Sequence, residues 1–358
     1  MTTDIKFLHA FNTIPGIGPA TLRTLKSYFG SFEAAWHATP SGLKEALSEA
    51  RAERIIAWKK PSLNPDKEME SLIRAQISFI HENDPQYPAP LKEIPQPPVV
   101  LYMQGKLPEN QCIAVVGTRR PTTYGRETAE VFTRACAEAG LGIVSGLAIG
   151  IDTVAHLTTL DIKGKTVAVL GSGIDRDTIF PQENRMLARK IVESGGAVLS
   201  EYAPKTPAVK EHFPQRNRIV SGLSRGVLVI EARERSGALI TAHFALEHNR
   251  EVFAVPGSIF SPTSKGPHLL IQQGAKLVIE PKDLLDELGL SYTQSERMSR
   301  EPQNEVDQII ITFLEEPLSF DAIKERSGLE SSVINAAISR LELNGYIRNL
   351  GQDTYQKI

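Results

Sequence analysis

The sequence is short of cysteine and of long apolar runs, and each shortage excludes a class of protein. Only two cysteines, Cys112 and Cys136, occur in 358 residues, which is too few for a disulfide framework and lacks the grouping of a zinc site. No stretch reaches the roughly 18 consecutive apolar residues that a membrane-spanning helix needs. The first residues, MTTDIKFLHAFN, also lack the basic and then apolar layout of a secretory signal. The sequence therefore predicts a cytoplasmic protein without a membrane span, in which both cysteines are small buried side chains.

A large charge excess is also missing, because the formal net charge is −2 at pH 7. Global electrostatics alone would therefore not draw the chain to nucleic acid. The charges are unevenly distributed, however. Residues 205–235 contain seven Lys or Arg against three Glu, a local excess of four positive charges. We therefore expect a local basic surface on a nearly neutral protein.

The length and the spacing of apolar residues predict an α/β protein of several domains. Residues 1–82 have helical periodicity without strand-like runs, which indicates a small helical domain. A proline-rich stretch opens residues 83–290, where short apolar runs such as IAVVG, VAVLG and VLVIE then alternate with helix-length amphipathic segments. Runs that are apolar on both faces predict a Rossmann-like, doubly wound, mostly parallel sheet with helices on both sides.

The last part of the chain predicts a second, smaller fold. Residues 291–304 are polar and indicate a linker. Residues 305–358 contain three amphipathic segments followed by two short strand-like runs around a glycine turn. Three helices and a hairpin together describe a winged helix.

The first strand of the central domain leads into GTRRPTTYGRE, residues 117–127. Backbone N–H groups of such a turn, and the helix start that follows it, face an anion at the carboxyl edge of the sheet. The glycine spacing departs from the GxGxxG of dinucleotide enzymes, and Arg119 and Arg120 suit phosphodiesters along a strand. The alternative is that both arginines are solvated loop charges.

The next two strands end in small residues, which let a chain or a ligand approach the backbone closely. These segments are SGLAIGID, residues 145–152, and GSGID, residues 171–175. Asp152 and His156 have the i, i+4 spacing of a metal pair, but no third ligand is evident. Helix capping and core packing are therefore the favoured roles, and no metal is predicted.

The segment FPQRNRIVSGLS, residues 213–224, contains side chains suited to nucleic acid. Arg216 and Arg218 would neutralise phosphates. Asn217 would bond a phosphate or a base, and Phe213 would stack on a base. The alternative makes Phe213 a core ring and Arg218 a structural ion-pair partner. Downstream, EARERSGALITA places further phosphate-binding residues at another helix start.

Taken in order, VVGTRRPTTYG, IVSGLAIGIDTVAH, VAVLGSGID, FPQRNRIVSGLS, EARERSGALITA, VFAVPG and LIQQGA resemble the conserved elements of the DprA/Smf family of DNA-processing proteins. They cover the whole central domain, and YPAPLKEIPQPPVVLYMQG resembles the family's segment just upstream. One departure is visible. Where the family often has Gly, a small residue and Asn, this chain has Gly266, Pro267 and His268, so that loop is left out of the predicted site.

The resemblance implies a non-enzymatic, cytoplasmic protein that binds and protects incoming single-stranded DNA. It also implies help in loading RecA recombinase during natural transformation and recombination, and a homodimer made through the central domain. No catalytic residue, metal or cofactor is implied. Carried onto this chain, the nucleic-acid-binding residues are Gly117, Thr118, Arg119, Arg120, Ser145, Gly146, Lys210, Phe213, Arg216, Asn217, Arg218, Arg235, Ser236 and Gly237.

The two end domains leave alternatives open. IPGIGPATLRTL, residues 14–25, is similar to a helix-hairpin-helix element, as found in small SAM-like helical domains, whose glycine turn meets a phosphate. It occurs once, so packing within the helical domain is an equal alternative. In the winged helix, the presumed recognition helix offers Arg340 as its one cation, opposed by Glu342. Duplex binders usually carry several cations there, so protein contact or weak duplex contact is favoured.

Enzymes built on similar sheets are the competing interpretation. Phosphoribohydrolases carry a PGGxGTxxE segment whose Glu acts at the ribose, whereas the nearest segment here, RSGALITAH, lacks the glycine pattern and the Glu. Glu201 and Glu231 remain as acids near strand ends, and we expect each to cap a backbone or pair with an arginine. A dinucleotide-dependent enzyme is disfavoured by the missing GxGxxG. A binding adaptor is therefore the favoured class.

Overall fold

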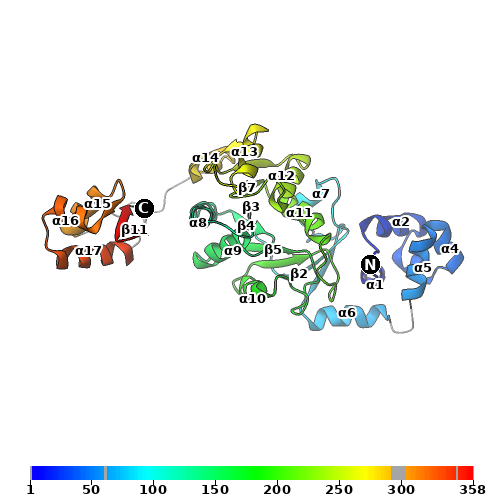
Figure 1. Ribbon diagram of the computed structural model, residues 1–358. Coiled ribbons are helices and arrows are strands. Elements are labelled where there is room, and N and C mark those ends of the chain that lie inside the picture. The colour runs from blue at the N-terminus through cyan, green and yellow to red at the C-terminus, as the bar shows by residue number, and fades with distance from the viewer. Residues whose placement is uncertain (1, 60–62, 292–303, 344–345, 358) are drawn as a thin grey trace. The chain divides into compact units, whose positions relative to one another are not determined.

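The computed structural model describes residues 2–59, 63–291, 304–343 and 346–357. The chain falls into two compact units, Met1–Tyr292 and Thr293–Ile358, whose elements are labelled in Figure 1. The first unit contains a group of N-terminal helices and a large sheet with its covering helices. The second unit contains a small domain of helices and strands.

The described chain up to Arg74 forms helices, as predicted. Polar residues start several of them: the Ser31 side chain accepts a hydrogen bond from the backbone N–H of Ala34, and Thr39 accepts one from Gly42. Gly30, at φ 76°, ends one helix in the left-handed conformation. The helices are α1 (Thr2–Asn12), α2 (Pro19–Phe29), α3 (Phe32–His37), α4 (Pro40–Ala46), α5 (Glu49–Trp58) and α6 (Pro65–Arg74).

A nine-stranded sheet, counted over the described residues, forms the centre of the first unit in the order β1-β2-β6-β5-β4-β3-β7-β8-β9. All strands from β6 to β9 in this order are parallel, which confirms the predicted doubly wound sheet, and β1 and β2 extend it in antiparallel fashion. The strands are β1 (Ser78–His81), β2 (Val100–Gly105), β3 (Cys112–Val116), β4 (Gly142–Ser145), β5 (Thr166–Leu170), β6 (Ala197–Ser200), β7 (Gly226–Val229), β8 (Glu251–Ala254) and β9 (Lys276–Leu277).

One strand lies where none was expected. The prediction that residues 1–82 contain no strand is wrong, because β1 occupies Ser78–His81 and pairs with β2, with Ile80 opposite Leu101. A strand of four residues directly after a helix is too short for an alternating pattern to stand out from the helical one. The sheet therefore begins before residue 83.

Helices cover both faces of the sheet, which explains why its strands are apolar on both sides. On β3, Ile113 and Val115 pack with α8, α9 and α14, whereas Ala114 and Val116 face the cluster that contains α11, α12 and α13. Figure 1 shows α8 and α9 on one side of the strands and α11 and α12 on the other. The helices are α7 (Ala89–Lys92), α8 (Thr123–Glu138), α9 (Ile151–Asp161), α10 (Arg185–Glu193), α11 (His212–Gly222), α12 (Gly237–Glu247), α13 (Lys265–Gln272) and α14 (Pro281–Glu287), with a 3-10 turn at Gln182–Asn184.

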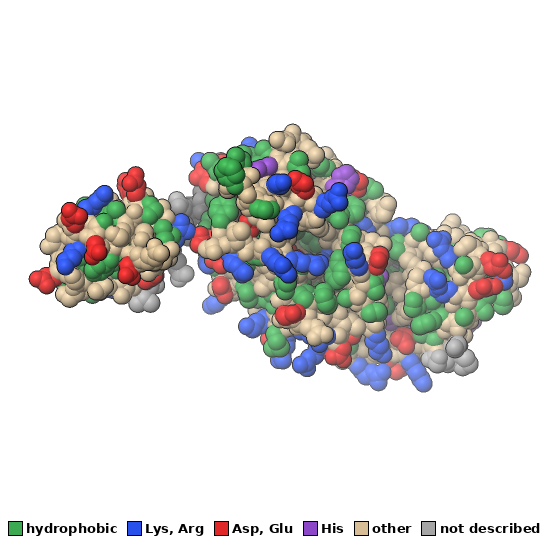
Figure 2. Space-filling view, viewed as in Figure 1, with side chains coloured by type: hydrophobic (Ala, Val, Ile, Leu, Met, Phe, Trp, Pro, Cys, Tyr) green, Lys and Arg blue, Asp and Glu red, His purple; other side chains and the backbone are tan. Residues whose placement is uncertain are grey.

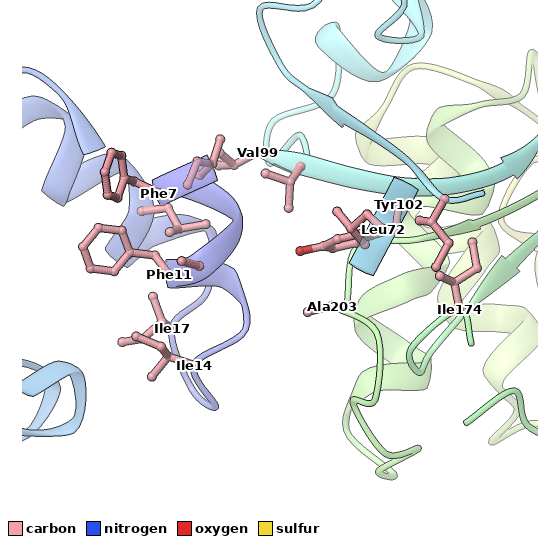
Figure 3. Packing of buried hydrophobic residues seen from close by; sticks show 14 of the residues in the cluster. Phe7, Phe11, Ile14, Ile17, Leu72, Val99, Tyr102, Ile174 and Ala203 are labelled. Carbon is pink, nitrogen blue, oxygen red and sulfur yellow. The ribbon is translucent and has the colours of Figure 1, made fainter. Parts of the chain in front are cut away.

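The N-terminal helices share a hydrophobic core with the sheet. Tyr102 of β2 is fully buried, and its hydroxyl lies 2.8 Å from Nδ1 of His9 and accepts a hydrogen bond of 3.1 Å from Asn12. Figure 3 shows residues of the shared cluster from both parts, among them Phe11 of α1 and Tyr102. Burial lowers the pKa of His9 to about 4, so its ring is neutral at pH 7. The helices and the sheet thus form one packed body.

The second unit has the predicted winged-helix fold. Its sheet has the order β10-β12-β11, and Ile310, Ile323, Ile334 and Leu341 are buried in its core. The expected linker, residues 291–304, lies outside the described residues except at its two ends. The elements are α15 (Glu305–Phe313), β10 (Leu318–Ser319), α16 (Phe320–Ser327), α17 (Ser331–Leu343), β11 (Ile347–Gly351) and β12 (Thr354–Lys357).

The two cysteines and the apolar character of the helices are the features from which the sequence analysis began. Both cysteines are free thiols; Cys136 is buried, as expected, whereas Cys112 is only partly buried. Burial raises the pKa of each thiol to about 12. Among the described helices, none combines the length and the apolar character needed to cross a bilayer.

Candidate nucleic-acid interface

The predicted site residues gather at the carboxyl edge of the central strands. Because β3 lies between β4 and β7 and all three are parallel, the turns that follow them meet at one edge. These turns contain residues 117–125, 145–150 and 231–237, and α11 packs against β5 and α12. Figure 2 shows Lys and Arg side chains around a hollow on this unit.

The buried carboxylate of Glu231 organises the turn after β3. One of its oxygens accepts hydrogen bonds from the hydroxyls of Thr122 and Thr263, both at 2.8 Å, and the other accepts the backbone N–H of Thr122 at 2.9 Å. A Cβ on Gly125 would lie 2.2 Å from the second oxygen, so the carboxylate requires a glycine there. Glu231 therefore caps the start of α8, as expected, and both of its oxygens are occupied.

The same turn presents Arg119 and Arg120 to solvent. The Arg119 guanidinium carbon lies 5.8 Å from the centre of the Phe213 ring, and that ring lies 5.7 Å from the ring of Phe180. Phe213 is partly buried and packs against Gly171, where a Cβ would lie 2.9 Å from its Cδ1. Phe213 is therefore a surface ring held on the scaffold, and the alternative that makes it a core ring does not hold.

Phe180 was not foreseen from the sequence. Its side chain is 45% exposed, although it is a large apolar ring. It follows GSGIDRDTI, a segment without helical or strand periodicity, so nothing in the sequence placed it beside Phe213. A phenylalanine within a polar segment that follows a glycine-rich strand end is the sequence signal that could have found it.

Arg216 corrects one prediction. It lies within helix α11 and is 5% exposed, with its guanidinium donating hydrogen bonds to the carbonyl oxygens of Gly146, at 2.6 Å, and Val169. A Cβ on Gly146 would lie 2.7 Å from Nη2 of Arg216, so the glycine makes room for the arginine. Burial lowers the pKa of Arg216 to about 10, while nearby Asp152 opposes that shift. The arginine supports the β4–α9 loop from within.

Asp152 also has a different role from the expected helix cap. Its carboxylate accepts the backbone N–H groups of Gly146, at 3.1 Å, and Ala148, at 3.2 Å, and so holds the loop that precedes α9. Burial raises the pKa of Asp152, and Arg216 acts in the opposite direction. Ser145, at the start of this loop, is fully buried and donates to the Val115 carbonyl oxygen at 2.7 Å. Ser145 and Gly146 are therefore buried, not exposed at the edge.

Arg218 corrects a second prediction. It was expected to neutralise a phosphate, but it lies in α11, is 8% exposed and forms a salt bridge with Glu201, which is 7% exposed. The alternative reading as an ion-pair partner is the one that the contacts support, and the expected pairing of Glu201 with an arginine is confirmed. The second terminal nitrogen of Arg218, Nη1, is buried without a hydrogen-bond partner in the described part of the chain.

The remaining predicted residues lie around the start of α12 and before α11. Ser236 caps α12 by accepting the backbone N–H of Ala238 at 3.3 Å, and Asn217 donates to the carbonyl oxygen of Gly237 at 3.0 Å. Lys210 and Arg235 are exposed. The edge thus carries four exposed cations from the predicted set, which are Arg119, Arg120, Lys210 and Arg235.

His156 has a buried hydrogen-bond partner of its own. Its Nδ1 lies 2.7 Å from the hydroxyl of Thr166, and burial lowers its pKa to about 3. No group of three or more metal-ligating side chains occurs within the described residues. In the winged helix, Arg340 of α17 forms a two-pronged contact with Asp307 at 2.7 and 3.2 Å. The cation of the presumed recognition helix is thus engaged inside its own domain.

The fold and the edge define a class: a Rossmann-like α/β protein with a winged helix and a cationic, aromatic surface at the carboxyl ends of its strands. Comparison with known proteins gives the family. Residues 78–289 match the model of DNA recombination-mediator protein A, and residues 294–352 match the DprA winged helix domain. The chain is 34% identical to Protein Smf of Synechocystis sp. over 97% of each chain. It therefore belongs to the DNA recombination-mediator protein A (DprA/Smf) family.

Two solved structures are similar to the chain. DNA processing protein A of Streptococcus pneumoniae is 35% identical, with a TM-score of 0.64 over 82% of this chain and 98% of that one. DNA processing protein A of Helicobacter pylori is 29% identical, with a TM-score of 0.53 over 60% of this chain and 95% of that one. The Helicobacter structure is described as giving insight into a unique single-stranded DNA binding mode of that protein.

Proposed function

We propose that this protein binds single-stranded DNA at the carboxyl edge of its central sheet and acts by binding, not by catalysis. The observation that carries the proposal is the row formed by Arg119, Phe213 and Phe180, in which an exposed cation lies over one ring and a second ring is 45% exposed. Aromatic faces stack on bases of any sequence, and cations beside them follow the phosphates. The single-strand binding of the Helicobacter relative supports the same assignment.

The proposed surface comprises the full set of predicted residues in two layers. Arg119, Arg120, Lys210 and Arg235 supply exposed charge for phosphates. Beneath them, Ser145, Gly146, Arg216 and Arg218 hold the loops in place, and Gly117, Thr118, Asn217, Ser236 and Gly237 form the turns between the layers. Because these groups address the backbone and any base face, we expect little base preference.

The biological role proposed for the protein is protection of incoming DNA in natural transformation and recombination, in the cytoplasm. Family membership supports this role. Help in loading RecA recombinase is proposed on the same ground alone, and no surface of this chain is assigned to RecA. For the winged helix we propose contact with a protein or weak contact with duplex DNA, since Arg340 is engaged by Asp307.

We also propose a homodimer through the central domain. The last strand in the sheet order, β9, is an edge strand, and large apolar side chains are exposed on β9, just after it and in the loop before α13. Ile279 is 72% exposed, Phe260 is 90% exposed and Leu277 of β9 itself is 43% exposed. Figure 2 shows hydrophobic side chains gathered on this unit where Figure 1 places α13. Such a patch at an unpaired strand edge favours self-association.

The domain division is kept as a proposal with one change. We propose an N-terminal helical domain in residues 1–82, a Rossmann-like DNA-binding domain in residues 83–290, a linker in residues 291–304 and a winged helix in residues 305–358. Because β1 is part of the sheet, the boundary between the first two domains moves to before residue 78.

The test of the proposed function is a salt-titrated binding assay that compares single-stranded with duplex DNA of the same sequence. The expected result is tighter binding of the single strand, with an affinity that falls steeply as salt rises, because phosphate contacts release counterions. Equal affinity for the two forms, or an affinity that does not respond to salt, would overturn the proposal.

A further inference from the structure

A cleft of about 1280 Å³ lies between the glycine turn that follows α1 and the loop that joins β6 to α11. Residues 12–21 line one side, and residues 201–207, with Val209 and His212, line the other. Both sides belong to the same compact unit. None of the exposed cations of the proposed DNA edge lines this cleft, so it is a separate feature.

The cleft contains an arginine with one unsatisfied hydrogen-bond donor. Arg218 lines it, and one terminal nitrogen of its guanidinium is bound to Glu201, while Nη1 is buried without a hydrogen-bond partner among the described residues. A buried N–H group left without an acceptor is costly and rare, so it points to an acceptor that the chain itself does not supply. A phosphate oxygen in the cleft is the kind of acceptor that an arginine prefers.

Further charges and rings in the cleft suit a nucleotide. Arg51 and Lys205 are exposed on its two sides. The His212 ring is stacked on Tyr202, with centres 3.9 Å apart and an angle of 17° between the planes. The Trp58 side chain, which also lines the cleft, is 46% exposed. Two accessible cations together with exposed aromatic surface are the combination that single-stranded nucleic acids require.

Helix α11 connects the cleft with the proposed DNA edge. Phe213, which lies under Arg119, is the next residue after His212, and Gln215 of the same helical turn lines the cleft. A strand that stacks on Phe213 therefore needs only to pass the start of α11 to enter the cleft. Glu68 and Glu201 are the acids in the lining, and Glu201 is already neutralised by Arg218.

We infer that this cleft binds a second stretch of the same single strand, with phosphates at Arg51 and Lys205 and a base against the exposed Trp58. The inference rests on the proposed function. A free nucleotide has the same chemistry as one unit of a strand, so the experiment includes a deoxynucleoside monophosphate as a separate probe.

The experiment uses the full chain and two oligothymidylates, one of about 5 nucleotides, which covers the edge alone, and one of about 20. The double variant Arg51→Ala/Lys205→Ala removes the two exposed cations. Its matched control is Lys67→Ala/Arg74→Ala, which removes one Lys and one Arg that are exposed on α6 and do not line the cleft.

For the cleft variant we expect roughly tenfold weaker binding of the long strand and unchanged binding of the short one. The slope of log affinity against log salt for the long strand should fall by about 1.4, because each phosphate contact on a single strand contributes about 0.7. The control variant should behave as the parent. Quenching of Trp58 fluorescence, obtained as the difference between the parent and Trp58→Phe, should occur with the long strand and not with the short one.

The outcomes separate the two proposals. If the parent binds both strands but the cleft variant binds the long one as tightly as the parent does, the inference fails and the proposed function stands. If the monophosphate quenches Trp58 while the long strand does not, the cleft is a nucleotide site and the inference is also overturned. If the parent binds neither strand, both the proposed function and the inference fail.

Discussion

Arg119 and Arg218 were both predicted to contact DNA, but Arg119 is exposed whereas Arg218 is buried in a salt bridge. Arg119 is exposed on a turn, so its replacement removes a contact with DNA and no interaction that stabilises the fold. We predict that Arg119→Ala weakens single-strand binding by about 1 kcal/mol or more, roughly fivefold, while the free energy of unfolding changes by less than about 0.5 kcal/mol. Arg189→Ala is the control, because it removes an exposed arginine that forms a salt bridge with Glu193 on α10. A large fall in melting temperature for Arg119→Ala with normal DNA binding would contradict the assignment.

Arg216 is predicted to act through stability. Its replacement by alanine removes the guanidinium that donates to the carbonyl oxygens of Gly146 and Val169, and it leaves the buried Asp152 without its neighbouring cation. Loss of one partner from a buried charged group typically costs about 3–5 kcal/mol. Chemical denaturation of Arg216→Ala should show a loss of this size, whereas Arg120→Ala, exposed on the same edge, should unfold like the parent. A loss below about 1 kcal/mol for Arg216→Ala would show that the loop does not depend on it.

For single residues, the location of the site could be predicted well from the sequence. Which of its side chains are exposed could be predicted less well. Turns after parallel strands converge whatever their side chains are, so the segment around Arg119 could be placed from periodicity alone. The burial of Arg216 and Arg218 could not be predicted in this way, because FPQRN contains Pro214 and few apolar residues and so shows no helical periodicity. Pro214 is tolerated in the first turn of α11, where its missing N–H has no partner in the helix.

At the level of elements, the edge strand β9 gives a prediction about association. Ile279, just past β9, is 72% exposed, as is Ile73 on α6. We predict that Ile279→Asp shifts the full chain from dimer to monomer in sedimentation at micromolar concentration, because a charge at the edge of a sheet opposes pairing. Ile73→Asp is matched in exposure and should leave the association unchanged. Equal effects of the two changes would place the interface elsewhere.

Long helices and strands could be predicted from the sequence, whereas the shortest strands could not. The runs that became β3 to β8 are apolar on both faces and could be recognised, and long helices such as α8 followed from their periodicity. β1 and β10 have four and two residues, and their existence depends on pairing with β2 and β12, which local sequence does not encode.

The first unit as a whole should lose stability in acid. Burial lowers the pKa of His9 to about 4 and that of His156 to about 3, below the ordinary value of about 6.5 in an unfolded chain. Between these pKa values and pH 6.5, the unfolded chain binds protons that the folded chain does not bind. The free energy of unfolding therefore falls as the pH drops below about 6.5. In urea titrations between pH 7 and 5, His9→Gln should show a shallower decrease than the parent. Parallel curves would mean that His9 is not held neutral.

Tyr102 ties the N-terminal helices to the sheet, and this has a consequence for proteolysis and for shortened forms of the chain. Removal of residues 1–82 would take away β1 together with His9 and Asn12, so the buried Tyr102 hydroxyl would lose both partners and the outer edge of β2 would lose its neighbour. An uncovered edge of this kind pairs readily with another copy. We therefore expect a chain cut at that boundary to form dimers through β2, the edge that β1 covers in the intact chain. Sedimentation of such a fragment would report an artificial interface, and only the intact chain can reveal the natural one.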